Sequence, residues 1–480
     1  MHIHNRPIVL ACFSLMICLG VLSCKKMINV PSPINSITTS EMFSTDAQAL
    51  TSMAGVYSVM VNWPLSFSNG YVTILGGMSA DEMFYNGTGD AHILGFTPNQ
   101  LLENNTYTST VWTNAYKTIY NANSAIEGIA ESESTSFTDS MRTELTAEAK
   151  FVRAYCYFYL INLYGDVPLV LTVDFNKTRY LIRTPVVEVY DQIIRDLQDA
   201  QEGLSPDYAK TGVLKERILP TKWAATALLA RVHLYKGDYA KAAEQATAVI
   251  SNSLLFSLET DLNNVFKIAS KEAIWQLKQG TSDATYKNST LEGNTLLPNP
   301  FATAITRYCL TASLLNTFET GDRRRTNWVG SNNGTNYYPY KYKTGFTQGV
   351  INAAPTEYYM MLRLAEVYLV RAEAEANGAG GGVSAAIADL NVVRARAGVP
   401  ALSTTLTQAQ TITAVARERQ VELFAEWSHR WIDLKRTNKA HDVLSAMSSK
   451  QPWAGDYQLL YPVPPVEIQV NPRVEQNPEY

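Results

Sequence analysis

The stretch from Ala147 to Leu171 constrains the fold of this chain most, because it predicts a helix, its surroundings and its end. Apolar residues recur in it at steps of three and four, the spacing that lines one face of a helix, and a second apolar row fills most of the opposite side. Such a helix has to be buried between other helices. Gly165 tolerates a left-handed turn and Pro168 cannot continue a helix, so the helix is predicted to end at about Tyr164.

Two later stretches have the pattern of paired helices. In residues 222–250, small residues stand where two helices would touch, and Gly237 begins a Gly-Asp-Tyr turn between them, as in tetratricopeptide repeats. Residues 362–398 repeat this arrangement around a glycine-rich loop. The sequence therefore predicts a mainly α fold, a tetratricopeptide-like solenoid of α-hairpins with its repeats mainly in 107–251 and 355–436.

The segment 252–354 interrupts the helical pattern. It loses the helical period and gains Asn, Gly, Thr, Tyr and Pro, with short strands predicted at Ala273 to Leu277 and Tyr337 to Tyr342. Segments this long without helices are usually functional or belong to a second subdomain. We interpret it, together with the polar and aromatic residues 83–109, as the irregular, loop-rich part that faces a ligand.

The N-terminal 23 residues have the pattern of a signal peptide. An apolar run from Ile8 to Leu22 is too short for a comfortable membrane span, and the bacterial lipobox Val21-Leu22-Ser23-Cys24 follows it. This pattern predicts cleavage before Cys24 and lipidation of its thiol, with residues 24–40 as a tether. An ordinary secretory signal that is cleaved nearby is the alternative.

Three segments of the mature chain resemble the SusD/RagB family of outer-membrane nutrient-binding lipoproteins. In the first segment the matching residues are Glu148, Ala149, Lys150, Phe151, Arg153, Ala154, Tyr157, Phe158, Leu160, Leu163, Tyr164, Gly165, Asp166 and Pro168. In the second they are Glu418, Arg419, Glu422, Leu423, Glu426, His429, Arg430, Trp431, Asp433 and Leu434. In the closing tail they are Pro462, Pro464, Glu467, Asn471, Pro472, Gln476, Asn477, Pro478 and Tyr480. Glu479 departs from the family, which usually has Gly there, and we expect this to change the last turn.

The resemblance implies a SusD-like domain over residues 41–480 that closes with an extended proline-rich strap, 459–480. It implies a protein of the outer membrane, lipid-anchored and facing the cell exterior. Such a protein captures a glycan or another nutrient and passes it to a TonB-dependent SusC-like barrel, over which it sits as a lid. This function needs no cofactor, and we expect the chain not to be an enzyme.

Composition and the absence of motifs also favour a binding protein over an enzyme or a nucleic-acid-binding protein. The net charge of −4 and the absence of a long Lys/Arg run exclude nucleic acid as a main partner. No nucleotide, metal or nucleophile motif is present. We therefore expect no catalytic and no metal-binding residue. A carbohydrate-active hydrolase on a helical scaffold is the alternative function, because sequence cannot exclude two opposed carboxylates; a purely structural assembly module is a third.

Several polar residues have a structural interpretation. Asp81 and Glu82 are adjacent and so do not face one site, which favours capping or hydrogen bonding over acid–base chemistry. In Arg417 to Arg436, the apolar stripe predicts one helix, with Glu426 and Arg430 paired on its exposed face. His429 on this helix is interpreted as an interior hydrogen-bonding group.

Cys156 and Cys309 are the two cysteines that remain after Cys24 in the mature chain. They can form a disulfide in an exported protein, but Cys156 lies within an apolar helix, which favours a small buried side chain. We expect no disulfide framework.

Aromatic residues are the main candidates for ligand binding, since the chain has 27 Tyr and 8 Trp. Aromatic faces bind the CH groups of sugar rings, while Asn and Asp hold the hydroxyls. Most of these rings must belong to the core. The better candidates lie in polar loops, and they are Trp63, Tyr71, Tyr85, Asn86, Trp328, Tyr337 and Tyr338.

Overall fold

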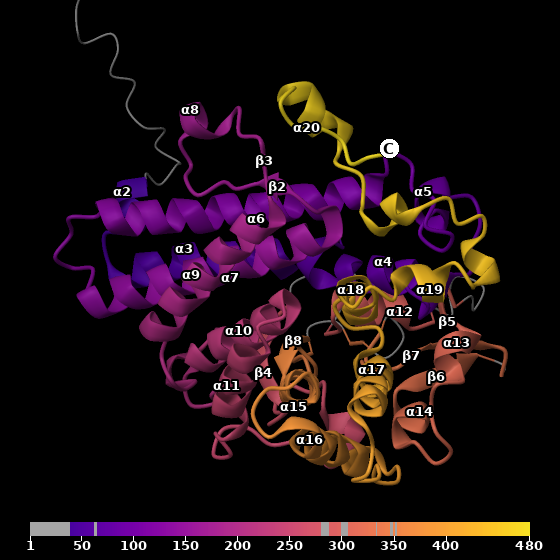
Figure 1. The fold of residues 1–480 in the computed structure, drawn as a ribbon. Coiled ribbons are helices and arrows are strands. Elements are labelled where there is room, and N and C mark those ends of the chain that lie inside the picture. The colour runs from indigo at the N-terminus through magenta and orange to yellow at the C-terminus, as the bar shows by residue number, and fades with distance from the viewer. Residues whose placement is uncertain are drawn as a thin grey trace, which may run out of the picture.

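The computed structural model describes residues 39–61, 65–279, 288–298, 306–332, 334–345, 349–350 and 353–480. At its centre is α7 (Asp139–Tyr164), which packs between α6 (Thr106–Glu131) and α9 (Val186–Gly203) (Figure 1). Nearly every residue from Phe151 to Tyr164 is buried. Gly165 ends the helix with a φ of 78°. The prediction of a buried helix that stops at Tyr164 is therefore confirmed.

Two α-hairpins continue the array. α10 (Lys222–Lys236) and α11 (Tyr239–Ile250) form one, and α15 (Leu364–Ala376) and α16 (Gly382–Ala397) form the other. Gly237 turns the first hairpin in the left-handed conformation, with a φ of 77°. α11 packs on α15, which joins the two hairpins across the 113 residues that separate them in sequence. The mainly α, tetratricopeptide-like architecture is thus confirmed.

The N-terminal part lies beneath α6 and α7. α2 (Thr39–Met42) and α3 (Asp46–Val61) lead into it, and α3 packs on both central helices. α4 (Tyr71–Ser79) follows and is buried almost entirely. The described part of the chain contains no helix long and apolar enough to cross a bilayer.

The strands are short and form antiparallel pairs. The pairs are β1 (Met83–Tyr85) with β5 (Tyr308–Leu310), β2 (Val167–Pro168) with β3 (Arg183–Thr184), β4 (Ala273–Leu277) with β8 (Tyr359–Arg363), and β6 (Val329–Asn332) with β7 (Asn336–Pro339). β4 has the predicted bounds. The strand predicted from Tyr337 to Tyr342 is shorter and begins one residue earlier, as β7 from Asn336 to Pro339. The Tyr340 N–H, in the same register, donates to the Trp328 carbonyl at 2.7 Å.

The helix predicted from Arg417 to Arg436 is broken in the middle. α17 (Gln408–Leu423) and α18 (His429–Arg436) are separated by a turn in which Ala425, Trp427 and Ser428 have positive φ values. The turn bonds to α4: the Trp427 N–H donates to Thr73 Oγ1 at 3.0 Å, and the Ser428 hydroxyl donates to the Val72 carbonyl. The contact to α4 replaces the helical hydrogen bonds that are lost.

The break also changes the ion pairs in this region. Glu426 is buried and accepts from the Arg363 guanidinium at 2.8 Å. Arg430 pairs instead with Asp81, at 2.7 Å between Nε and Oδ1. The predicted exposed pair of Glu426 with Arg430 is therefore wrong, because Glu426 lies in the turn and only Arg430 lies on α18.

Glu422 lies at the centre of a buried ionic network. Arg363 reaches it at 2.6 Å and Arg324 at 3.0 Å, and Arg396 also contacts it. Glu272 bonds two of the same guanidinium groups, at 2.9 Å each. Three arginines oppose these carboxylates, so the pKa of Glu422 is lowered although burial alone would raise it.

The C-terminal strap departs from the predicted extended conformation. α20 (Pro465–Val470) forms within it, with proline in its first turn. Asn477 ties the strap to the core by donating to the carbonyls of Tyr164 and Tyr461, at 2.9 and 2.8 Å. Glu479 has a φ of 66°, a conformation that favours glycine.

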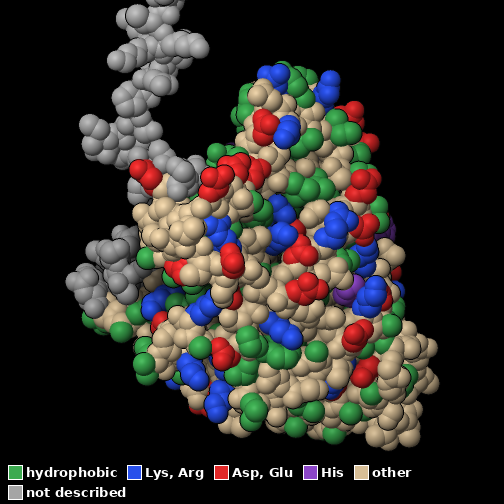
Figure 2. Space-filling model, turned by 90° about the vertical axis from the view of Figure 1, so that its left-hand side faces the viewer, with side chains coloured by type: hydrophobic (Ala, Val, Ile, Leu, Met, Phe, Trp, Pro, Cys, Tyr) green, Lys and Arg blue, Asp and Glu red, His purple; other side chains and the backbone are tan. Residues whose placement is uncertain are grey.

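The remaining elements are short. They are α5 (Ala91–Leu94), α8 (Phe175–Thr178), α12 (Leu291–Leu296), α13 (Ala312–Leu315), α14 (Arg323–Asn327) and α19 (Ala440–Leu444). Cys156 and Cys309 are buried free thiols, as the sequence predicts. On the face in Figure 2, acidic and basic side chains are interspersed.

Candidate functional site

Four tyrosines lie close together beside α5. With Asp90 and Asn86 we call them the tyrosine cluster, and they are Tyr71, Tyr85, Tyr107 and Tyr308. Tyr71 and Tyr107 meet edge to face at 5.4 Å between ring centroids. Tyr85 and Tyr308 are tilted against each other at 5.5 Å. All but Tyr308 keep part of their surface exposed. The cluster therefore presents aromatic surface and polar groups together.

The backbone of β1 and β5 positions one side of the cluster. Tyr85 is opposite Tyr308 in the antiparallel register. Asn86 extends the pairing, since its N–H donates to the Arg307 carbonyl at 2.7 Å and its side-chain amide to the Thr306 carbonyl at 3.3 Å. This fixes the Asn86 side chain at the end of the strand pair.

Asp90 positions the other side. Its carboxylate caps the N-terminus of α5 by accepting from the N–H groups of His92 and Ile93, at 3.0 and 3.3 Å. Its second oxygen accepts from the Tyr107 hydroxyl at 2.6 Å. That hydrogen bond is the main reason why the pKa of Asp90 lies below its usual value. Asp90 is therefore an ionised acceptor at neutral pH.

The four phenols are donors. Burial, and then the Asp90 charge, raise the pKa of Tyr71, and burial also raises the pKa values of Tyr107 and Tyr308. Within the described residues, the hydroxyls of Tyr71, Tyr85 and Tyr308 make no hydrogen bond. They are available to a ligand that offers acceptor oxygens.

Tyr337 and Tyr338 lie on the neighbouring hairpin. β7, which carries them, is next to β5. The Arg325 guanidinium covers the ring of Tyr337 at 4.6 Å, and Tyr338 meets Tyr340 edge to face at 6.0 Å. Both rings are partly exposed. The structure thus brings Tyr71, Tyr85 and Asn86 together and places Tyr337 and Tyr338 beside them on a separate strand.

Two predicted ligand residues do not belong to this group. Trp328 is 0% exposed, donates its indole N–H to the Leu262 carbonyl at 3.0 Å and lies under the Lys341 ammonium group. Its polar neighbours in sequence suggested a loop, but the fold buries the ring, so it offers no face to a ligand. Trp63 and Cys24 lie outside the described residues.

Asp81 and Glu82 have structural roles, as predicted. Asp81 pairs with Arg430, and Glu82 accepts from the Ala425 N–H at 3.3 Å. Burial, together with the Asp81 charge, raises the pKa of Glu82 to about 8. His429 is interior, but its Nε2 is 4.0 Å from Glu366 Oε1, beyond hydrogen-bond distance. Burial and nearby arginines lower its pKa, so it is neutral.

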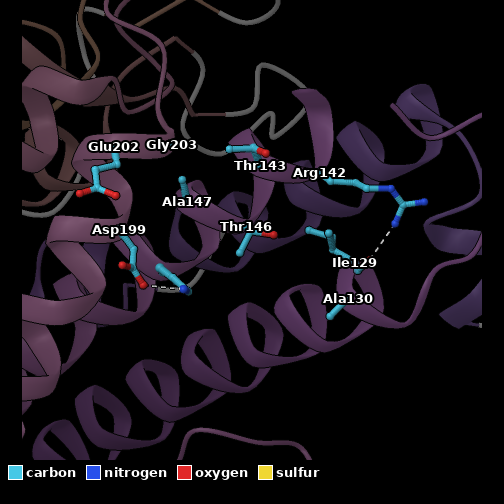
Figure 3. A pocket seen from close by; sticks show the side chains of 10 residues that line it. Ile129, Ala130, Arg142, Thr143, Thr146, Ala147, Asp199, Glu202 and Gly203 are labelled. Carbon is cyan, nitrogen blue, oxygen red and sulfur yellow. Dashed lines mark hydrogen bonds and ion pairs between the residues drawn. The ribbon is translucent and has the colours of Figure 1, made fainter. Parts of the chain in front are cut away.

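A cavity of about 540 Å³ lies elsewhere, between α6, α7 and α9 (Figure 3). Lys150 and Asp199 pair across it at 2.6 Å, and Arg142 donates to the Ile129 carbonyl at 3.0 Å. No aromatic side chain lines it. Lys150, Asp199 and Arg142 already have partners, so the cavity is a poor platform for a sugar ring.

A second cavity, of about 450 Å³, is mostly apolar. Its lining includes Tyr57 and Glu148, whose side chains are hydrogen-bonded at 2.5 Å. Burial raises the pKa of Glu148 to about 7. Neither cavity includes a residue of the tyrosine cluster, and the described residues contain no group of His, Cys, Asp and Glu suited to a metal ion.

Sequence reasoning missed three members of the cluster. Tyr107 and Asp90 lie within 83–109, and the polar and aromatic composition of this segment indicated a ligand-facing loop but did not single out these two residues. Tyr308 joins the cluster only because β5 pairs with β1, more than 200 residues earlier. No local pattern in a single sequence reports such a pairing.

Comparison with known proteins places this fold in a family. The family model described as starch-binding and associating with the outer membrane matches residues 35–234, and the model described as the SusD family matches residues 325–480. The two models together match most of the chain. This chain belongs to the SusD/RagB family. The resemblance that three sequence segments suggested is confirmed.

Relatives of this SusD-like chain match over most of their length. A SusD-like protein P2 of Formosa agariphila is 27% identical over 425 residues, which cover 79% of this chain and 82% of the relative. A SusD-like protein of Bacteroides ovatus is 28% identical over 383 residues, which cover 68% of this chain and 65% of the relative.

Solved structures share the fold. A laminarin-binding SusD-like protein superposes with a TM-score of 0.76 at 23% identity, covering 91% of this chain and all (100%) of the other. A SusD superfamily protein of Bacteroides vulgatus superposes with a TM-score of 0.78 at 18% identity, with coverages of 91% and 100%. At these identities the likeness shows the SusD-like fold, and the ligand has to be argued from this chain's own residues.

Proposed function

We propose that this SusD-like chain binds a glycan at the cell surface through the tyrosine cluster and delivers it to a SusC-like TonB-dependent barrel of the outer membrane. The tyrosine cluster is the observation that supports this most. It combines partly exposed aromatic rings with phenol donors and one ionised carboxylate, on a fold whose family model describes starch-binding proteins.

The chemistry of the cluster suits a sugar. The CH face of a pyranose ring packs on an aromatic face, which here is offered by Tyr85 and Tyr71. The hydroxyls of the sugar donate to Asp90 and accept from the phenols. The laminarin-binding relative with the same fold supports a glycan over a peptide or another nutrient.

The proposed ligand residues are Tyr71, Tyr85 and Asn86, extended by Tyr337 and Tyr338 on β7. Trp63, outside the described residues, stays a prediction. We add Asp90, Tyr107 and Tyr308 to this proposed set, because Asp90 accepts from Tyr107 and Tyr308 lies against Tyr85. No observation favours the alternative, a hydrolase.

A glycan array with the purified protein tests the ligand, followed by titration calorimetry with the glycan that binds. We expect Tyr85→Ala and Tyr338→Ala to weaken binding, while Tyr120→Ala, an exposed tyrosine of α6, leaves it unchanged. If every variant binds as tightly as the wild type, the site is wrong. Shortened oligosaccharide products that one Asp or Glu substitution abolishes would show an enzyme instead.

We propose that the protein is located at the outer membrane. After cleavage of the signal peptide 1–23, a lipid on Cys24 would anchor it, and residues 24–40 would form the tether. Cys24→Ala should release the protein from membranes into the periplasm or medium. A variant that still fractionates fully with membranes lacking the barrel would contradict the anchor.

The proposed barrel partner is tested separately. We expect the protein to be recovered in a complex with the barrel after mild detergent extraction. Recovery of the monomer alone, while the barrel is abundant, would contradict this partner.

A further inference from the structure

Asparagine is followed by glycine at several places in the chain, and this pair is the one most prone to deamidation. Glycine has no side chain that hinders its own nitrogen when that nitrogen attacks the asparagine amide. The pairs are Asn69-Gly70, Asn86-Gly87, Asn333-Gly334 and Asn377-Gly378. Asn333 lies outside the described residues, so the other three pairs can be compared.

The reaction needs no reactant other than water. The glycine nitrogen loses its proton and bonds to the asparagine Cγ, the bond from Cγ to Nδ2 breaks, and ammonia leaves with that proton. Water then opens the resulting succinimide ring at one of its two carbonyl carbons, which gives aspartate or isoaspartate. A folded protein protects an asparagine by holding these atoms in hydrogen bonds or by keeping water away from them.

Two of the three pairs are protected in these ways. Asn69 is only 3% exposed, so water does not reach its amide. At the end of α15, the Asn377 side-chain amide donates to the Glu373 carbonyl at 2.8 Å. The Gly378 N–H donates to the Glu375 carbonyl at 3.0 Å. Both hydrogen bonds would have to open before the Gly378 nitrogen could attack Asn377.

The third pair, Asn86-Gly87, follows β1 in the tyrosine cluster and is held least. Both residues are partly exposed. Within the described residues the Gly87 N–H makes no hydrogen bond. The Asn86 amide has one long hydrogen bond, 3.3 Å to the Thr306 carbonyl. We infer that Asn86 is a deamidation site of the folded protein.

The position of the Tyr85 ring explains why glycine follows Asn86. A Cβ atom on Gly87 would lie 2.5 Å from Cζ of Tyr85, closer than two carbon atoms can approach. The tip of the ring therefore occupies the space that a side chain at position 87 would need. The glycine that makes room for the Tyr85 ring is thus also the residue that makes Asn86 reactive.

Deamidation would change the end of the strand pair. A carboxylate only accepts hydrogen bonds, so aspartate at position 86 could not donate to the Thr306 carbonyl. Isoaspartate adds a methylene group to the main chain, between the N–H that bonds Arg307 and the nitrogen of Gly87. Both products would disturb the backbone next to Tyr85. The expected loss of glycan binding rests on the proposed function.

Peptide mapping by mass spectrometry tests the deamidation site. The purified folded protein is incubated in mildly alkaline buffer, and an isoaspartyl methyltransferase labels isoaspartate. We expect Asn86 to react at least about tenfold faster than Asn377, because two hydrogen bonds protect the latter pair. In urea the rates at Asn69, Asn86 and Asn377 should become similar. Equal rates in the folded protein, or an Asn86 that reacts only in urea, would overturn the inference.

Two variants confirm the position. Asn86→Gln should abolish the product at position 86, because ring closure from the longer side chain is much slower, whereas Asn377→Gln should leave the rate at Asn86 unchanged. A product at position 86 in both variants would contradict the assignment.

Calorimetry with the glycan found on the array then tests the effect on binding. The number of binding sites per chain should fall in proportion to the isoaspartate that has formed at position 86. If the incubated protein binds as well as the fresh protein, the modification does not act on the ligand site. If the fresh protein binds no glycan, the proposed function fails, and the mass spectra still decide whether Asn86 reacts.

Discussion

Tyr155, Tyr157 and Tyr159 of α7 are buried on all sides, whereas Tyr71, Tyr85 and Tyr107 of the tyrosine cluster keep part of their surface in solvent. Two of the three core hydroxyls have protein partners: Tyr157 donates to the Val170 carbonyl at 2.9 Å, and Tyr159 accepts from Arg231 at 2.9 Å. The third, the Tyr155 hydroxyl, is buried without a partner among the described residues. In the cluster, the rings of Tyr71 and Tyr85 reach solvent, and their hydroxyls make no hydrogen bond within the described residues. The number of tyrosines therefore says little about binding, whereas the exposure of each ring, together with the partner of its hydroxyl, distinguishes the two regions.

The largest effect is expected in the core. Phe158 is fully buried and meets Tyr159 edge to face at 5.1 Å. Phe158→Ala should lower the free energy of unfolding by about 3–5 kcal/mol, because it leaves a cavity in a packed helix. Urea unfolding measures this. Phe175→Ala, at an exposed position, should cost less than about 0.5 kcal/mol. Equal losses at the two sites would break the comparison between core and surface.

The pH dependence of stability tests the burial of Glu82, which directly precedes β1. Its folded pKa is about 8, above the ordinary value of 4.5, because the carboxyl is buried. Between these two values the folded protein keeps a proton that the unfolded chain has lost. The contribution of Glu82 to stability is therefore greatest below pH 4.5 and is lost as the pH rises through 8.

Glu82→Gln removes this dependence. At pH 9 the variant should be more stable than the wild type by about 2–4 kcal/mol, and the difference should shrink toward pH 5. Thermal unfolding across this range gives the slope. A difference that is constant with pH would show that Glu82 is ionised in the folded protein.

The tyrosine cluster should respond in binding and hardly in stability. Tyr85→Ala should weaken glycan binding by about 1–3 kcal/mol, the loss typical of a central aromatic contact. Tyr85→Phe should retain most of the affinity if the ring face makes the contact. Calorimetry with the glycan found on the array measures both. A loss of unfolding free energy as large as for Phe158→Ala would place Tyr85 in the core.

The smallest effect concerns the strap that links the two regions. Glu479 has a φ of 66°, which disfavours side chains. Glu479→Gly should raise the unfolding free energy by about 0.5–1 kcal/mol without a change in binding. Differential scanning calorimetry resolves such a shift. A lower melting temperature would show that the Glu479 side chain makes a stabilising contact.

The sequence predicted those structural features that are decided by residues close together in the chain. The ends of α7 and α10 follow from Gly165 and Gly237, whose positive φ values are local requirements. β4 follows from its own apolar run. These features were predicted because the residues that decide them are neighbours in sequence.

Features that distant contacts decide were missed. The break between α17 and α18 uses Ala425, Trp427 and Ser428 in a conformation for which these residue types give no signal, and bonds to α4 hold it. Trp328 is buried through Leu262 and Lys341, and Tyr308 is placed by β1. The tyrosine cluster depends on such a distant contact at Tyr308, which is why this member could not be predicted from the sequence.

The buried ionic network has a consequence for the order in which the chain is made. Arg324, Arg363 and Arg396 are synthesised before Glu418, Glu422 and Glu426, the carboxylates that accept from them. A guanidinium group that is removed from water without its carboxylate costs several kcal/mol. Asp322 and Glu272, which are made earlier, pair with the same arginines but supply only part of the carboxylates. The network can therefore be completed only after residue 426 has been made, so the final packing of the C-terminal half comes late in synthesis.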